Sequence, residues 1–417
     1  MGKKLGKMKN PLHELLETNI DFKKWYYKAR DQGFYVYAVT GIPNQWSHLN
    51  EKEKQKRLRY LHICSPEEIE RIISPTNVSD LLLRYRADSI ISNMRILRMF
   101  EKRASYVKES EWTLKDQFDD SIFGTFHDKI AEKHRKNIND ITFGTFFSDD
   151  PNGYCIKTKF GPLIILSEAL KKFFYFMNLS LHGFRVDVNN KVSQLTQEQA
   201  LLIGIRTMVL TESFDFEIDP RGEVPEDIDR AVKEMATLEM LFAIAHEYAH
   251  FLLNHLDDRN VTSKVMSHLM ASKLPLHFER VTIYSQSQVQ EFEADNFGIK
   301  ILSGDDVKKE REILLYAITV MSYFDIFEAL IHVILEKASP SDSHPSARER
   351  RKRMIKIGRK IWDSDELETC KRLIRIANFF KKRVIIWYTK NPSTFTQYGS
   401  IYLDQWKGKP KIDRIDY

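Results

Sequence analysis

The chain has 417 residues, of which 42% are hydrophobic and 29% charged, and its formal net charge is +6 at neutral pH. These values are ordinary for folded proteins and exclude fibrous and largely disordered classes. The cysteines Cys64, Cys155 and Cys370 lie far apart and form no CxxC pair, which argues against a disulfide framework and a cysteine zinc site. We therefore expect a reducing, cytoplasmic location.

Residues 1–150 are expected to be mainly helical, with an early strand at 33–40. Ser65 followed by Pro66 and two acids is typical of a helix start. This region shows no cluster of chemistry-bearing residues, and the turn-rich segment 149–153 predicts a boundary after it. We therefore treat residues 1–150 as an N-terminal region suited to regulation or substrate recognition.

The second part of the chain is expected to begin with a strand at 154–160 and a helix at 163–179. Further helices are expected at 197–209, at 225–256 and at 287–302. The last two of these helices carry the residues that point to a function.

An HExxH motif, formed by His246, Glu247 and His250, lies on the long helix. Residues four apart lie on the same helix face, so both imidazoles can reach one metal ion. Glu247 follows the first histidine and can act as the general base for a metal-bound water. The apolar flanks predict a buried helix, where this polar set would be costly without a metal. The motif therefore predicts a zinc site.

A second acidic pattern, which contains Glu291 and Asp295, lies on the next expected helix. Glu291 can supply the third ligand, because hydrolase zinc sites use three protein ligands, and two histidines with one glutamate form a known set. Asp295 is four residues later on the same face and can orient a ligand histidine through its ring N–H. Glu293 points to another side of the helix and is a less favoured ligand.

A third candidate is His344, which precedes Pro345 and an expected basic helix. His344 can face the metal cleft and stabilise a developing oxyanion as a catalytic residue. The spacing fits a histidine in a capping loop equally well, so both interpretations stay open.

Two segments bear on membrane and nucleic-acid partners. Residues 313–335 are long and apolar enough to span a bilayer, but Asp325 and Glu328 interrupt them, so we expect a buried core helix and no membrane partner. Residues 341–417 carry 19 Lys and Arg against 9 Asp and Glu. No nucleic-acid motif accompanies this basic segment, so a solvated helix face is favoured over a nucleic-acid site.

Three patterns, HEYAH at 246–250, EFEAD at 291–295 and SHPSARERR at 343–351, occur in an order that resembles gluzincin peptidases of the HtpX and CAAX-processing type. The resemblance is closer to Lit-like phage-exclusion proteases and covers about residues 160–353. The lack of clear membrane helices departs from the HtpX type and indicates a soluble relative.

The resemblance implies roles for individual residues: zinc ligation by His246, His250 and Glu291, proton transfer by Glu247, support of a ligand by Asp295, and the downstream catalytic histidine position for His344. It also implies peptide-bond hydrolysis in an intracellular protein target, in a phage-defence or toxin-like role.

Sequence and resemblance together predict a predominantly helical α+β protein, with a zincin-like core at 151–360 and a basic extension at 361–417. We expect a soluble zinc endopeptidase that acts on a protein substrate. Residues 1–150 or a protein partner are expected to activate or inhibit this enzyme. The alternative is a zinc-containing binding or regulatory protein that contacts nucleic acid through its basic C-terminal segment. Glu247→Gln separates the two, because only the enzyme would lose its function.

Overall fold

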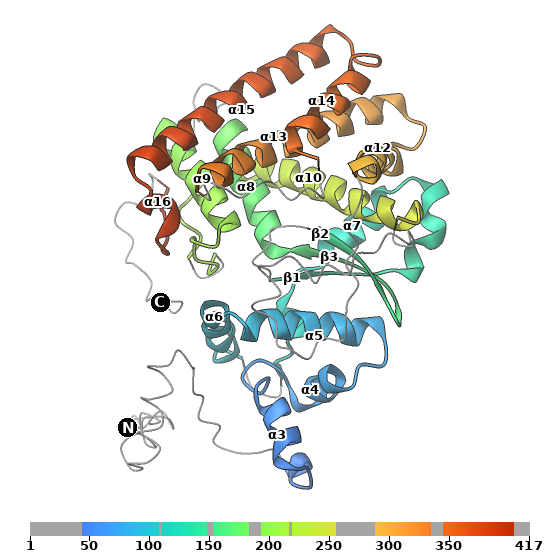
Figure 1. The fold of residues 1–417 in the computed structure, drawn as a ribbon, viewed down its shortest axis with the longest axis vertical. Coiled ribbons are helices and arrows are strands. Elements are labelled where there is room, and N and C mark those ends of the chain that lie inside the picture. The colour runs from blue at the N-terminus through green and yellow to red at the C-terminus, as the bar shows by residue number, and fades with distance from the viewer. Residues whose placement is uncertain are drawn as a thin grey trace, which may run out of the picture.

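The structure of the chain is a computed structural model that describes residues 44–107, 111–147, 153–182, 193–216, 219–255, 288–334 and 345–403. The described part is predominantly helical with one small sheet, which confirms the expected α+β class (Figure 1). The expected strand at 33–40 and the candidate residue His344 lie outside the described residues.

The N-terminal helices build a core of their own. Ser65 caps α4 as expected, because its side chain accepts from the Glu68 amide while the Glu68 carboxylate accepts from the Ser65 amide. The buried side chains of this core include Trp46, Ile69 and Phe100. The helices of this region are η1 (Asn44–Trp46), α3 (Glu51–Leu58), α4 (Pro66–Ile73), α5 (Val78–Ile91), α6 (Met94–Ala104) and η3 (Lys115–Gln117).

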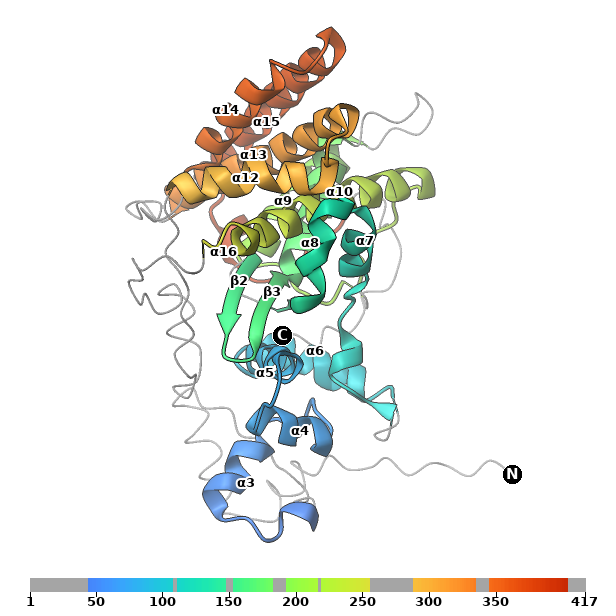
Figure 2. The same ribbon diagram turned by 90° about the vertical axis from the view of Figure 1, so that its right-hand side faces the viewer.

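A three-stranded sheet lies between α5 on one face and the later helices on the other (Figures 1 and 2). The strand order is β1-β3-β2, with β1 parallel and β2 antiparallel to β3. Cα partners include Thr142 with Leu163 and Cys155 with Ile164. The strands are β1 (Thr142–Phe146), β2 (Gly153–Thr158) and β3 (Gly161–Ser167), and α7 (Ser121–Lys129) and η4 (Glu132–Asp140) precede them.

The strand expected at 154–160 corresponds to β2, but the helix expected at 163–179 begins only after β3. In β3, Leu163 and Ile165 pack with α5, whereas Ile164 and Leu166 pack with the main core. Both faces of this strand are buried, so its sequence is a continuous apolar run without alternation. Such a run does not distinguish a buried strand from a helix, which explains why the expectation was wrong.

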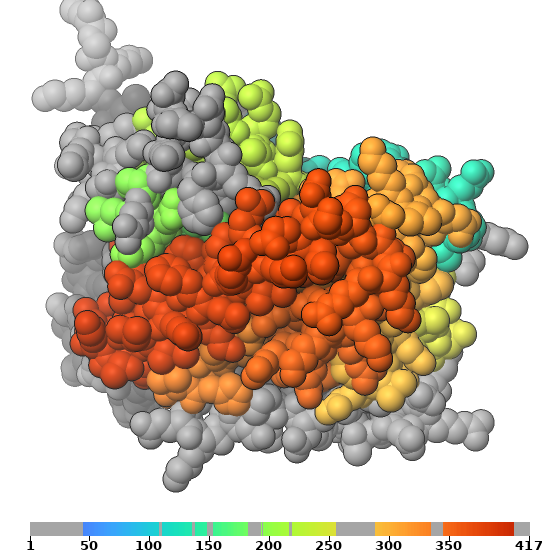
Figure 3. Space-filling model, turned by 90° about the horizontal axis from the view of Figure 1, so that it is seen from above, coloured from blue at the N-terminus to red at the C-terminus, as the bar shows by residue number. Residues whose placement is uncertain are grey.

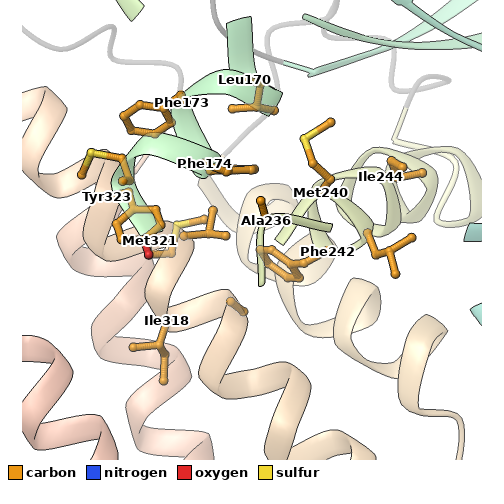
Figure 4. Packing of buried hydrophobic residues seen from close by; sticks show 14 of the residues in the cluster. Leu170, Phe173, Phe174, Ala236, Met240, Phe242, Ile244, Ile318, Met321 and Tyr323 are labelled. Atoms are coloured by element: carbon orange, nitrogen blue, oxygen red, sulfur yellow. The ribbon is translucent and has the colours of Figure 1, made fainter. Parts of the chain in front are cut away.

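The main core surrounds the long helix α10 (Glu226–Leu252). Phe173 and Phe174 of α8 (Glu168–His182) pack there with Met240 of α10 and with Tyr323, from a helix far along the chain (Figure 4). α9 (Gln194–Met208) packs against α8. A helix surrounded by apolar side chains on most sides is held firmly, so residues projecting from α10 keep a defined geometry.

The apolar segment expected to be a core helix is α13 (Val307–Ile334). It is the only helix in the described ranges that is long and apolar enough to cross a membrane, and 61% of its most apolar window is buried inside the protein. Packing within the core therefore accounts for its apolar composition, as expected for a buried core helix. α12 (Gln288–Ser303) packs between α13 and α10.

The C-terminal helices α14 (Ala347–Gly358) and α15 (Ser364–Lys390) form an outer layer over α13 (Figures 1 and 3). The layer is tied down by Asp325 of α13, which pairs with Arg351 at 2.9 Å and with Lys381 at 2.6 Å. Most other basic side chains of α14 are exposed, as expected for a solvated face. A short helix, α16 (Ser393–Thr396), follows.

The predicted boundary at residue 150 falls between β1 and β2, which belong to one sheet. Phe123 and Phe126 of α7, which precede this boundary, belong to the same core as α10. The boundary at residue 360 falls between α14 and α15, which both pack on α13.

Candidate metal centre

Two histidines of α10 form the base of the candidate site. His246 and His250 are four residues apart on a buried face, with only 8% and 0% of their surfaces exposed. Their Nε2 atoms lie 3.2 Å apart. Between them, Tyr248 donates from its hydroxyl to the carbonyl of His134 at 2.8 Å and is itself fully buried, which holds the helix in place.

The third member of the site is Glu291 in the first turn of α12. Its carboxylate oxygens lie 3.4 Å from Nε2 of His246 and 3.7 Å from Nε2 of His250. Gly298 allows the helices to approach, because a Cβ there would lie 3.1 Å from the His246 backbone nitrogen. We call His246, His250 and Glu291 the metal centre.

The spacing of these donors fits a tetrahedral ion. Zinc binds imidazole nitrogen and carboxylate oxygen at about 2.0–2.2 Å, so neighbouring ligand atoms around it lie roughly 3.3–3.6 Å apart. The distances between His246, His250 and Glu291, at 3.2, 3.4 and 3.7 Å, lie close to that range, the last two involving different carboxylate oxygens, and donors on all three residues lie within 4.8 Å of one another. The buried group can therefore hold a metal ion, which confirms that part of the expectation.

Asp295 lies where the spacing on α12 predicted it. Its carboxylate is 3.0 Å from Nδ1 of His246, on the side of the ring opposite the metal centre, and only 2% of the residue is exposed. A histidine held in this way by a carboxylate presents Nε2 to a metal in a fixed orientation.

Arg350 of α14 was not identified from the sequence. Its guanidinium bonds to both oxygens of Asp295, and its Nη1 lies 3.6 Å from Glu291. Ser346 caps α14, and Glu328 of α13 accepts from the Ala347 amide, so the first turn that carries Arg350 is fixed. Its packing against α12 distinguishes Arg350 from its exposed basic neighbours, such as Arg348 in the same turn.

The pKa values of the two histidines are shifted in opposite directions. Burial lowers the pKa of His246 and Arg350 lowers it further, but hydrogen bonds to Asp295 and Glu291 outweigh both and raise it to about 9. Burial, with the neighbouring charge of His246, lowers the pKa of His250 to about 2. His250 is therefore uncharged at neutral pH, the form in which imidazole binds metals, whereas His246 must give up a proton before its Nε2 can bind one.

Glu247 lies beside β2 of the sheet. It is partly exposed, and a Cβ on Gly153, the first residue of β2, would lie 3.0 Å from its Cγ. Burial and the charge of Glu247 raise the pKa of Cys155 well above its usual value, so that thiol stays protonated. The HExxH glutamate therefore lies against β2 and directly follows the first histidine of the metal centre on α10.

Comparison with known proteins gives no match to any family model, curated protein or solved structure. The resemblance to gluzincin peptidases therefore rests on the three sequence patterns, of which the structure brings His246, His250, Glu291 and Asp295 together. Whether His344 belongs to the site stays a prediction.

Proposed function

We propose that the chain is a soluble, cytoplasmic zinc endopeptidase with a zincin-like core of the gluzincin type, closest to Lit-like proteases. The observation that carries this proposal is the convergence of Nε2 of His246, Nε2 of His250 and the Glu291 carboxylate in a buried cluster, with Glu247 directly following His246 on α10. An intracellular protein is the proposed substrate, in a phage-defence or toxin-like role.

The donor set favours zinc over other common ions. Calcium and magnesium prefer six or more oxygen ligands, whereas two imidazoles and one carboxylate are a typical catalytic zinc set. Three protein donors leave a fourth tetrahedral position for a water or a substrate. Zinc held there would supply Lewis acidity and a bound water of lowered pKa.

The chain's own residues then divide the remaining work. Glu247 would accept a proton from the attacking water as the general base and deliver it to the nitrogen of the leaving amine. Asp295 keeps the ring of His246 in one orientation, and Arg350 offsets the charges of Asp295 and Glu291. The positive charge of Arg350 explains why the buried carboxylates of Asp295 and Glu291 are tolerated so close together.

Control by residues 1–150 or by a protein partner stays part of the proposal. A cut at residue 150 would remove β1 from the sheet, so truncation there would disturb the fold as well as any control. Comparing the full chain alone and with cell extract tests for control without that disturbance. Equal hydrolysis in both would contradict control by a protein partner.

The test of the proposed function compares wild-type chain with Glu247→Gln, through zinc content and a search for new protein N-termini after expression. We expect about one zinc per chain in both proteins and new N-termini with the wild type only. If neither protein produces new N-termini while both bind nucleic acid through the basic C-terminal segment, the alternative of a zinc-containing binding protein is favoured.

A further inference from the structure

The end of α10 has a geometry that places one more histidine against the metal centre. Asn254 adopts a left-handed conformation with φ of 55°, and its amide donates to the carbonyl of Phe251 at 3.1 Å. The next amide, of His255, donates to the carbonyl of His250 at 3.0 Å. These two bonds form a Schellman motif, which closes a helix and turns the chain back over its last turn.

In such motifs the residue after the left-handed position usually makes an apolar contact with the last turn. Here the contact is polar. Nδ1 of His255 lies 2.9 Å from Nδ1 of His250, and 7% of His255 is exposed. On the other side of its ring, Nε2 of His255 lies 3.2 Å from the carboxylate of Glu293 on α12.

These distances allow one arrangement of protons when His250 binds a metal through Nε2. Its Nδ1 must then carry the hydrogen, so it donates to Nδ1 of His255. His255 therefore carries its own hydrogen on Nε2, and that nitrogen donates to Glu293. Each ring nitrogen in this chain of three residues thus has one defined role.

We propose that His255 and Glu293 are positioning residues that hold His250 for metal binding, as Asp295 does for His246. The inference rests on the proposed function. Glu293, which the sequence favours less than Glu291 as a metal ligand, would act through His255 and not touch the metal itself. The left-handed turn at Asn254 becomes part of the site, because it sets His255 above His250.

Asp295 and Glu293, the carboxylates proposed to position the two ligand histidines, differ in their surroundings. Asp295 is buried and paired with Arg350, whereas the Glu293 side chain is 56% exposed. A charge in contact with water contributes less than a buried one. We therefore expect His255 itself, rather than the charge of Glu293, to make most of the contribution.

The test measures zinc affinity of the full chain by chelator competition. Removal of a group that supports a ligand histidine typically costs 10- to 100-fold in affinity, so we expect that loss for His255→Leu. His255→Asn should recover most of it, because the amide oxygen can accept from Nδ1 of His250. His62→Leu is the matched control, since His62 also faces a carboxylate, Glu101 at 3.4 Å, but belongs to the N-terminal helices.

A second pair of variants tests the turn. Asn254→Gly keeps the left-handed conformation and should keep zinc affinity, whereas Asn254→Ala strains it and should weaken binding. Nitrogen-15 NMR of the zinc-loaded chain should show the hydrogen on Nδ1 in His250 and on Nε2 in His255.

Unchanged affinity in His255→Leu, or the opposite tautomer in His255, would overturn the inference while leaving the proposed function intact. A wild-type chain that binds no zinc would instead overturn the proposed function.

Discussion

Two buried glutamates, one among the N-terminal helices and one in the metal centre, show what distinguishes a site from a structural polar contact. Glu68 is 5% exposed, and its carboxylate accepts from the amides of Ser65, Leu114 and Lys115 at 3.0–3.1 Å. Glu291 is 1% exposed, yet its nearest imidazole nitrogens lie 3.4 and 3.7 Å away. Both carboxylates are buried, but the imidazole nitrogens around Glu291 lie far enough from it to leave room for an ion between the three residues.

The largest difference should appear when each carboxylate is made neutral. Glu291→Gln removes an anionic ligand, and we expect zinc content to fall from about one per chain to nearly none. Glu68→Gln should keep its zinc and lower the free energy of unfolding by about 1–3 kcal/mol, since backbone amides lose a charged acceptor. Metal analysis and denaturant titration of both variants check this. Equal zinc content in the two would contradict the comparison.

The next effect concerns Glu247 and β2. In Gly153→Ala the new Cβ would lie 2.6 Å from a Leu166 methyl, which must shift, and 3.0 Å from Cγ of Glu247, which must give by a few tenths of an ångström. A displacement of about 1 Å can cost roughly 10²-fold in rate. We therefore expect a smaller loss than this in peptide hydrolysis, with zinc content unchanged. Gly124→Ala is the control, since nothing lies within 4 Å of its new Cβ.

A smaller effect is expected where α12 crosses α10. In Gly298→Ala the Cβ would press on the backbone of Ala245 and His246, which cannot rotate away as a side chain can. We expect a cost of about 1–3 kcal/mol in stability and weaker zinc binding, because Glu291 moves away from the histidines. Calorimetry with and without zinc measures both, and Gly124→Ala again serves as the control. Unchanged zinc affinity would mean that the close approach is not needed.

The smallest effect should come from the N-terminal core. Ile69 is fully buried there, and Ile69→Val should cost about 0.5–1.5 kcal/mol in stability. Zinc affinity should stay unchanged, because the metal centre belongs to a different core. A parallel loss of zinc affinity would show that the two regions are coupled.

The features predictable from the sequence were those that depend on local periodicity. The HExxH spacing placed His246 and His250 on one face of a helix, and the same reasoning placed Glu291 and Asp295 on the next. The strand β3 was missed because its apolar run, buried on both faces, carries no period.

The supporting residues were missed for other reasons. Arg350 is one of many basic residues in its segment, and only the packing of α14 on α12 selects it. His255 lies beyond the end of α10, where its position depends on the left-handed conformation of Asn254 rather than on helical spacing.

The central claim is that two imidazoles and one carboxylate hold a single zinc ion. X-ray absorption at the zinc edge of the purified full chain tests it most directly. The account predicts about one zinc per chain, bound by two histidine nitrogens and by oxygen at about 2.0–2.1 Å, with the zinc lost or its histidine signal reduced in His250→Leu. A chain without zinc, or zinc whose ligands are unchanged in that variant, would contradict it.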